Sequence, residues 1–181
     1  MRSESDKLLE AVKEAIYIAE TAGVPLGISH YKVQGKSNWG LPKQGLQLIE
    51  QAISRGMEIT IDQYPYESGM THLYVSIPPK YISNGIGELI NLLKDKNIRE
   101  EIKSEMINPT TEFENYYICA NGFDGIFIAD CPTFKDSVGM TIGDYSRKLN
   151  IDPFDAFFDI LIKNHGVCTA IYFTMGEDDI F

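Results

Sequence analysis

The chain has 181 residues, of which 44% are hydrophobic and 11% aromatic, a composition typical of a globular protein with a buried core rather than of a disordered chain. Sixteen lysines and arginines against 26 aspartates and glutamates leave a formal net charge of −10, which argues against nucleic acid or an anionic membrane as a partner. Residues 1–7 are charged where a signal peptide is apolar, and no run approaches the roughly 18 apolar residues of a membrane span. We therefore expect a cytoplasmic protein.

The first 66 residues alternate between helical and strand patterns. Apolar residues recur at three- and four-residue steps between Leu8 and Ala19, which predicts an amphipathic helix, and Pro42 suits the first turn of a second helix. A buried strand is expected after each helix, over residues 24–30 and 57–62. Parallel neighbours need a helix to return the chain, so this order predicts an α/β fold with a parallel sheet.

The pattern loosens after Tyr66, and residues 67–130 are interpreted as an excursion or lid-like insertion within a single domain that spans residues 1–181. Helices are expected near 86–93 and 98–106, and β-rich runs at 116–120 and 125–131. Toward the end, Thr141 and Asp152 can cap two further helices, followed by a last strand over 167–173 and the start of a helix at 176–181.

The three cysteines, Cys119, Cys131 and Cys168, are odd in number and widely spaced. This pattern indicates neither a disulfide framework nor a zinc knuckle. We expect three ordinary buried thiols.

Of the three histidines, His30 is in the most informative place. It ends a predicted parallel strand, where ligands from neighbouring strands meet, so it is a candidate zinc ligand; the alternative is a structural histidine. His72 and His165 are expected to be solvated or capping residues. No histidine or carboxylate lies two or four residues from His30, so the sequence contains no self-sufficient zinc site.

Two further side chains are candidates for substrate binding. Lys32 can place its ammonium group beside the imidazole of His30, where a carboxylate-bearing substrate would bind, although a surface lysine is an equal alternative. Tyr64 lies at the end of the second strand and can line a pocket or cover the rim. No nucleophile elbow, P-loop or dinucleotide motif occurs in the sequence.

Four groups of residues together resemble the N-acyl-D-amino-acid deacylases, or D-aminoacylases, of the amidohydrolase superfamily. The groups are Met-Arg-Ser-Glu at 1–4, Val-Pro-Leu-Gly-Ile-Ser-His-Tyr-Lys at 24–32, Gly-Lys-Ser-Asn-Trp-Gly at 35–40 and Asp-Gln-Tyr-Pro-Tyr at 62–66. Their order and spacing match as well as their letters. The resemblance is strong over about the first 70 residues and weaker to the end.

The resemblance implies a (β/α)₈ barrel, of which this chain would be a part, and a zinc ion held by a cysteine and two histidines that activates water for amide cleavage. His30 matches one zinc-binding histidine, and Lys32 and Tyr64 match positions that contact the substrate's α-carboxylate. Met70 departs from the family, which often has serine there. The second histidine would precede Met1, and the catalytic aspartate would follow residue 181.

A lone imidazole cannot complete a tetrahedral zinc site, so we expect the chain to be an internal fragment that has no deacylase activity alone. Open sheet edges lead us to expect self-association. Two alternatives stay open: a non-catalytic binding or interaction domain derived from such an enzyme, and a hydrolase of cyclic amides that resembles dihydroorotase or hydantoinase.

Overall fold

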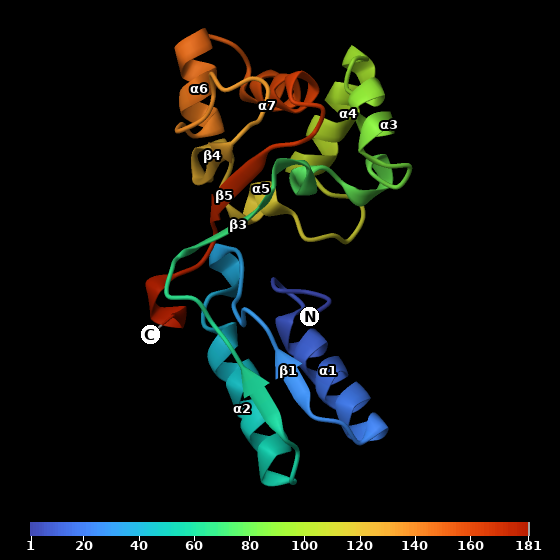
Figure 1. The fold of residues 1–181 in the computed structure, drawn as a ribbon, viewed down its shortest axis with the longest axis vertical. Coiled ribbons are helices and arrows are strands. Elements are labelled where there is room, and N and C mark those ends of the chain that lie inside the picture. Colours follow the sequence, from blue (N-terminus) through green and yellow to red (C-terminus); the bar gives the residue numbers. More distant parts are fainter. Residues whose placement is uncertain (181) are drawn as a thin grey trace. The chain divides into compact units, whose positions relative to one another are not determined.

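The computed structural model describes residues 1–180, and the chain divides into two compact units (Figure 1). Unit 1 comprises Met1–Glu67 and Thr174–Phe181, and unit 2 comprises Ser68–Phe173. The predicted lid-like insertion over 67–130 stays a prediction, because the second unit continues past its end to residue 173. No helix within residues 1–180 has the length and apolar character needed to cross a membrane.

Unit 1 has the predicted order of helix, strand, helix, strand. Helix α1 (Leu8–Ala22) precedes strand β1 (Leu26–Ile28), and helix α2 (Leu41–Ser54) precedes strand β2 (Ile59–Ile61). The strands pair in parallel, with Leu26 opposite Ile59 and Ile28 opposite Ile61. The prediction of a parallel α/β arrangement is confirmed for this pair, although each strand is shorter than its predicted range.

One apolar cluster joins both helices to the two strands. Ile28 of β1 is a buried member of this cluster, and Leu26 and Ile59 pack against it. Leu26 lies two residues before Ile28 and opposite Ile59, so the three side chains share one face of the sheet. Residues of alternate parity point to opposite faces of a sheet, so Gly27 and Thr60 belong to the other face, and both are exposed. The helices therefore cover only one face of this small sheet. The buried members of the cluster are Leu8, Val12, Ile16, Ile28, Tyr31, Val33, Ile49 and Ala52.

The last described residues pack against the loop before α2, within unit 1. The indole Nε1 of Trp39 donates a hydrogen bond to the carbonyl oxygen of Thr174 at 3.2 Å, and the amide of Gly40 donates to the carboxylate of Asp179 at 2.9 and 3.0 Å. A side chain at Gly176 would meet the ring of Trp39 at 2.8 Å. Where the sequence predicted the start of a helix, residues Glu177–Asp179 form a short 3₁₀ turn; residue 181 lies outside the described residues.

Unit 2 contains a three-stranded antiparallel sheet, which the sequence did not predict. Strand β5 (Thr169–Phe173) is central, between β3 (Ser68–His72) and β4 (Ile126–Asp130), and both neighbours run antiparallel to it. Strands β4 and β5 confirm two predicted strands. Strand β3 was missed because Ser-Gly-Met-Thr-His shows no alternation of apolar and polar residues.

Five α-helices of unit 2 lie in the connections between the strands of this sheet. They are α3 (Ile86–Leu92), α4 (Lys96–Ile107), α5 (Tyr116–Cys119), α6 (Ile142–Leu149) and α7 (Pro153–Lys163). The predicted caps are confirmed: the side chain of Thr141 accepts from the amide of Asp144 at 3.0 Å, and that of Asp152 accepts from Phe154 at 2.8 Å. The β prediction at 116–120 is wrong because Asn115 caps a helical turn there.

The core of unit 2 is far larger than that of unit 1 and includes a disulfide bond. Phe123, Phe154, Phe157 and Phe158 pack together with aliphatic residues from helices α3, α4 and α7. The prediction of three ordinary thiols is wrong, because Cys131 and Cys168 are bonded, with Cα atoms 4.5 Å apart. Asp130 pairs with Thr169, so the cysteines next to them, Cys131 and Cys168, come close together. Their separation of 37 residues in the sequence gave no indication of this bond.

Candidate functional site

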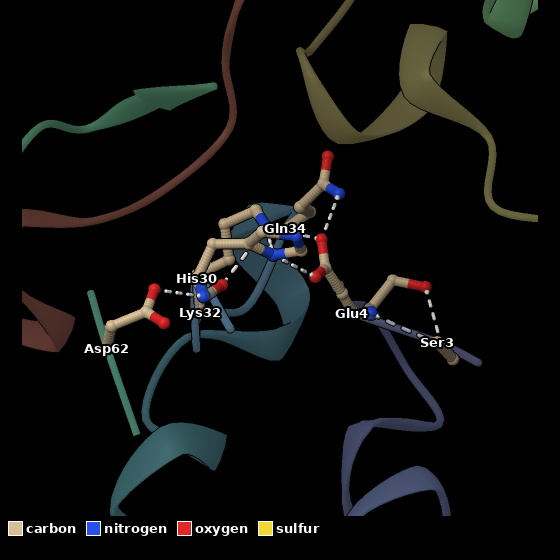
Figure 2. Close-up of polar contacts among 7 residues, drawn as sticks. Ser3, Glu4, His30, Lys32, Gln34 and Asp62 are labelled. Carbon is tan, nitrogen blue, oxygen red and sulfur yellow. Dashed lines mark hydrogen bonds and ion pairs between the residues drawn. The ribbon is translucent and has the colours of Figure 1, made fainter. Parts of the chain in front are cut away.

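The candidate site lies where strands β1 and β2 end, within unit 1 (Figure 2). Backbone pairing continues past both strands: the amide of Asp62 donates to the carbonyl oxygen of Ile28 at 3.2 Å, and the amide of Tyr31 donates to that of Asp62 at 2.8 Å. Between these bonds, the amide of His30 donates to the Oδ1 atom of Asp62 at 2.7 Å. Asp62 therefore fixes the backbone of His30.

His30 has an unusual backbone conformation, with φ at 44°. Positive φ is uncommon outside glycine, although histidine adopts it more readily than branched residues do. Such a conformation persists only where surrounding bonds hold it, as those of Asp62 do here. The imidazole remains 53% exposed, so it is accessible to a ligand.

A buried carboxylate joins His30 to Lys32. The Oε1 atom of Glu4 lies 2.8 Å from Nδ1 of His30, and its Oε2 atom forms an ion pair with the ammonium group of Lys32. The same ammonium nitrogen lies 3.0 Å from Nδ1 of His30 and 3.2 Å from the carbonyl oxygen of that residue. The side chains of Glu4 and Lys32 are only 11% and 10% exposed. The three groups thus form one compact polar cluster.

The chain around Glu4 is fixed by its own set of hydrogen bonds. The amide of Gln34 donates to the carbonyl oxygen of Glu4 at 2.7 Å, and the side-chain amide of Gln34 lies 3.5 Å from Oε2. On the other side, the amide of Ser5 donates to the hydroxyl of Ser3 at 3.3 Å. Figure 2 shows Glu4 between this turn and the residues that follow β1.

The aromatic ring of Tyr64 lies next to this polar cluster. The Nζ atom of Lys32 is 5.7 Å from the centroid of the Tyr64 ring, which is within the range of a cation–π interaction. The rings of Tyr64 and Tyr66 stack with centroids 6.4 Å apart. The structure therefore brings together His30, Lys32 and Tyr64, the three residues that the sequence singled out.

The other two histidines belong to unit 2. His72 is exposed in strand β3 and its ring stacks on Tyr74, with centroids 5.1 Å apart. His165 follows helix α7, has φ at 52° and is also exposed. Both are solvated, as the sequence predicted.

The described side chains around His30 supply too few ligands for zinc. One imidazole supplies one coordination position, and a structural or catalytic zinc site takes at least three protein ligands. Residues 1–180 contain no group of three or more histidine, cysteine, aspartate or glutamate side chains that could hold a metal. The described residues fit a single ligand and do not by themselves form a zinc site.

The chain is similar to known proteins both in sequence and in structure. No family model matches the chain. It is 40% identical over 73 residues to a D-aminoacylase of Alcaligenes xylosoxydans xylosoxydans, and 32% identical over 73 residues to an N-acyl-D-glutamate deacylase of the same organism. The predicted relationship to the D-aminoacylases is confirmed. Each match covers 40% of this chain and 15% of the relative.

Solved D-aminoacylase-type structures share the fold over almost the whole chain. An N-acyl-D-glutamate deacylase of Bordetella bronchiseptica, in complex with zinc and a phosphonate that mimics the tetrahedral intermediate, aligns with a TM-score of 0.65 and 23% identity. A crystal structure of D-aminoacylase aligns with a TM-score of 0.63 and 24% identity. Both alignments cover 99% of this chain and 28% of the solved chain. This chain thus spans under a third of these D-aminoacylase structures.

Sequence reasoning missed two residues of the site, Glu4 and Asp62. Both residues stood in motifs that match the family, and the sequence assigned neither of them a role. Their partners lie 26 to 32 residues away along the chain, as in the contact of Asp62 with His30. The one available signal was position, since Asp62 directly follows a strand that ends beside His30.

Proposed function

We propose that this chain is a segment of a zinc-dependent hydrolase that cleaves the amide bond of N-acyl-D-amino acids. The observation that carries the proposal is the 40% identity with a D-aminoacylase over 73 residues, together with the shared fold over 99% of the chain. On this proposal, the parallel β1–β2 pair is part of a (β/α)₈ barrel whose remaining strands are not among the described residues.

In this function His30 is a zinc ligand. Its support is the position after a parallel strand, the half-exposed imidazole and a backbone held by Asp62. Zinc would polarise the amide carbonyl and activate water when bound. The role of His30 itself is to present one imidazole nitrogen at a fixed place.

Lys32 and Tyr64 are the proposed contacts of the substrate's α-carboxylate. The ammonium group of Lys32 lies against Tyr64 and close to His30, so one bound molecule can reach all three side chains. An ammonium group has three donors, and the Lys32 ammonium already contacts Glu4 and the carbonyl oxygen of His30. An incoming carboxylate would therefore share this group with Glu4 instead of meeting an isolated positive charge.

We further propose that the chain alone has no deacylase activity, since one imidazole cannot complete a zinc site. The test is hydrolysis of a panel of N-acetyl-D-amino acids by the purified chain with added zinc. We expect no turnover above the buffer rate. Zinc-dependent turnover that the substitution His30→Ala abolishes would show the opposite.

A chimera tests the proposed parent function directly. This segment would replace the matching segment of the Alcaligenes D-aminoacylase, and N-acetyl-D-amino acid hydrolysis and zinc content would be measured. We expect an active, zinc-containing chimera and loss of both properties on His30→Ala. His72→Ala is the matched control, because His72 is also an exposed histidine near a strand end, and it should change neither. A folded chimera without zinc would count against His30 as a ligand.

Self-association is the expected behaviour of the isolated chain. Strands of parallel sheets are normally covered on both faces, and here Gly27 and Thr60 are exposed on a two-stranded sheet. Light scattering should show a mass above 20.4 kDa that rises with concentration. A constant monomer mass at high concentration would refute this proposal.

A further inference from the structure

We propose that residues 174–179 form a clamp that ties together the two loops of the candidate site, and that Asp179 is the positioning residue of this clamp. The first loop, residues 29–40, leads from β1 to α2, and the second, residues 62–66, follows β2. Together they carry the side chains to which the proposed function assigns a role. The part that the clamp plays in substrate binding rests on that proposed function, whereas the clamp itself does not.

Asp179 makes a contact with each of the two loops. Its carboxylate oxygens accept from the backbone amide of Gly40 at 2.9 and 3.0 Å, and its backbone carbonyl oxygen accepts from the side-chain amide of Gln63 at 3.2 Å. Gln63 stands between Asp62 and Tyr64, both of which belong to the site. One residue therefore bridges the segments that follow β1 and β2.

The carboxylate of Asp179 also supplies a cap that helix α2 does not provide for itself. The N-cap residue is Gly40, which has no side chain to accept a hydrogen bond, and the first turn contains no acidic residue. The start of a helix leaves backbone amides without partners and carries partial positive charge, so a carboxylate there is stabilising. Asp179, 139 residues along the chain, brings this group and fixes the start of α2.

The start of α2 is bonded to the site through Tyr31. The carbonyl oxygen of Pro42, in the first turn, accepts from the hydroxyl of Tyr31 at 2.7 Å, and the Tyr31 side chain is buried. Tyr31 stands between His30 and Lys32, so its position sets where the side chains of these two residues leave the backbone. A shift of the start of α2 would therefore move the imidazole and the ammonium group.

The rest of the clamp is seated on the first loop. The carbonyl oxygen of Thr174 accepts from the amide of Gly35 at 2.8 Å and from the indole Nε1 of Trp39 at 3.2 Å. Gly176 is buried beside the ring of Trp39, where an added Cβ atom would lie 2.8 Å from a ring carbon. These contacts leave the backbone of the clamp little freedom, so the acidic turn after them reaches the start of α2 from a fixed place.

Amide hydrogen exchange of the ¹⁵N-labelled full chain, followed by NMR, tests the clamp. We expect the Gly40 amide of the wild type to be protected from exchange. Asp179→Ala should raise its exchange rate by roughly tenfold, the factor that one hydrogen bond to a carboxylate supports. Because the clamp holds both loops, the same variant should also shift the amide signals of His30, Lys32 and Tyr64.

Three further variants separate the clamp from an effect of charge alone. Asp178→Ala is the matched control, because it removes the same charge from an exposed residue of the same 3₁₀ turn, and it should change neither the exchange nor the signals. Asp179→Asn keeps an acceptor oxygen and should restore part of the protection. Gly176→Ala should release the clamp, because its φ of −97° suits alanine but the new methyl group meets the ring of Trp39. It should reproduce the signal changes of Asp179→Ala and shift the fluorescence of Trp39.

The D-aminoacylase chimera adds a readout of substrate binding. If the clamp positions Lys32 and Tyr64, Asp179→Ala should raise the KM for N-acetyl-D-amino acids by roughly tenfold with a smaller change in kcat, because contacts to the substrate are weakened more than the chemistry. Asp179→Asn should recover part of this loss, and Asp178→Ala should behave as the unsubstituted chimera. An unchanged KM in Asp179→Ala would overturn the positioning role.

The outcomes for Asp179 are separate from those for the parent function. A rapidly exchanging Gly40 amide in the folded wild type overturns the clamp, even if every variant fails to fold. Equal effects of Asp178→Ala and Asp179→Ala overturn it as well. Faster exchange at Gly40 with unchanged signals of His30 and Lys32 would reduce Asp179 to a helix cap and overturn its positioning role. An inactive chimera beside the expected exchange and signal changes would instead reject the deacylase function and leave the clamp standing.

Discussion

Units 1 and 2 differ in how fully each buries its own sheet. The two strands of unit 1 are covered by helices on one face only, and Gly27 and Thr60 on the other face are exposed. In unit 2 the strands β4 and β5 alternate between buried residues, such as Ile128 and Ala170, and half-buried ones. The unit with the smaller core also holds the polar cluster of Glu4, His30 and Lys32.

This difference indicates that unit 2 is the more stable unit, whereas unit 1 holds the candidate site. Unit 2 combines a large aromatic and aliphatic core with a disulfide bond, both of which favour an independently folding body. Unit 1 contains a short parallel pair, a type of sheet that is usually stable only with further strands. We therefore expect unit 2 to unfold at higher denaturant than unit 1.

Phe157→Ala should have the largest effect, and it should act on unit 2. The Phe157 side chain is fully buried, and its ring centroid lies 5.3 Å from those of Phe123 and Phe158. Truncation of such a residue costs about 3–5 kcal/mol through lost burial and the cavity that remains. Circular dichroism during urea unfolding should show the main transition at a lower midpoint.

The single tryptophan, Trp39, separates the two units in the same experiment, because it belongs to unit 1. If the units unfold independently, Phe157→Ala should leave the midpoint of the Trp39 fluorescence transition unchanged. An equal shift of both signals would show that the chain unfolds as one cooperative body, and the comparison of the units would fail.

Much of the helical and parallel structure could be predicted from the sequence because its signals are local. The apolar steps of α1, the proline at the start of α2 and the caps Thr141 and Asp152 each act within a few residues. Strand β3 could not be predicted, because its stability comes from pairing with β5, about 100 residues later. The disulfide depends on that same tertiary arrangement of strands.

The site was predictable to the same degree. His30, Lys32 and Tyr64 were found because strand ends and a family resemblance indicate them. Glu4 and Asp62 act on His30 through contacts between distant segments, which no spacing rule reveals. The positive φ of His30 likewise follows from the bond with Asp62 and has no signal in the sequence.

Alkaline pH should weaken unit 1 through Tyr31. Burial, followed by the negative charge of Asp179, raises the pKa of Tyr31 to about 12. Below pH 10 the phenol is protonated in both states, and between about pH 10 and 12 it ionises first in the unfolded chain. The free energy of unfolding should therefore fall by up to roughly 3 kcal/mol as the pH rises through this range.

Fluorescence of Trp39 in urea at stepped pH values measures this decline. Tyr31→Phe removes the ionisable group and should be less stable at neutral pH, since it loses the hydrogen bond to the carbonyl oxygen of Pro42. Its stability should nevertheless fall less steeply than that of the wild type above pH 10. Equal slopes would place the alkaline loss elsewhere than at Tyr31.

Gly45→Ala should have a smaller effect, again on unit 1. A Cβ atom at Gly45 would lie 2.0 Å from the hydroxyl oxygen of Tyr31, a buried group that also bonds to Pro42, so the ring must move. Such overpacking costs about 1–3 kcal/mol, which should appear as a lower midpoint of the Trp39 transition. Gly87→Ala is the matched control, because Gly87 lies in helix α3 of unit 2 and, apart from its chain neighbours and the backbone of its own helix, no atom is within 4 Å of its added Cβ. That change should be neutral or stabilise unit 2 by up to about 1 kcal/mol, since alanine favours the helix. If Gly45→Ala were as well tolerated as Gly87→Ala, α2 would not be held against Tyr31, and the loop that carries His30 and Lys32 would lack that support.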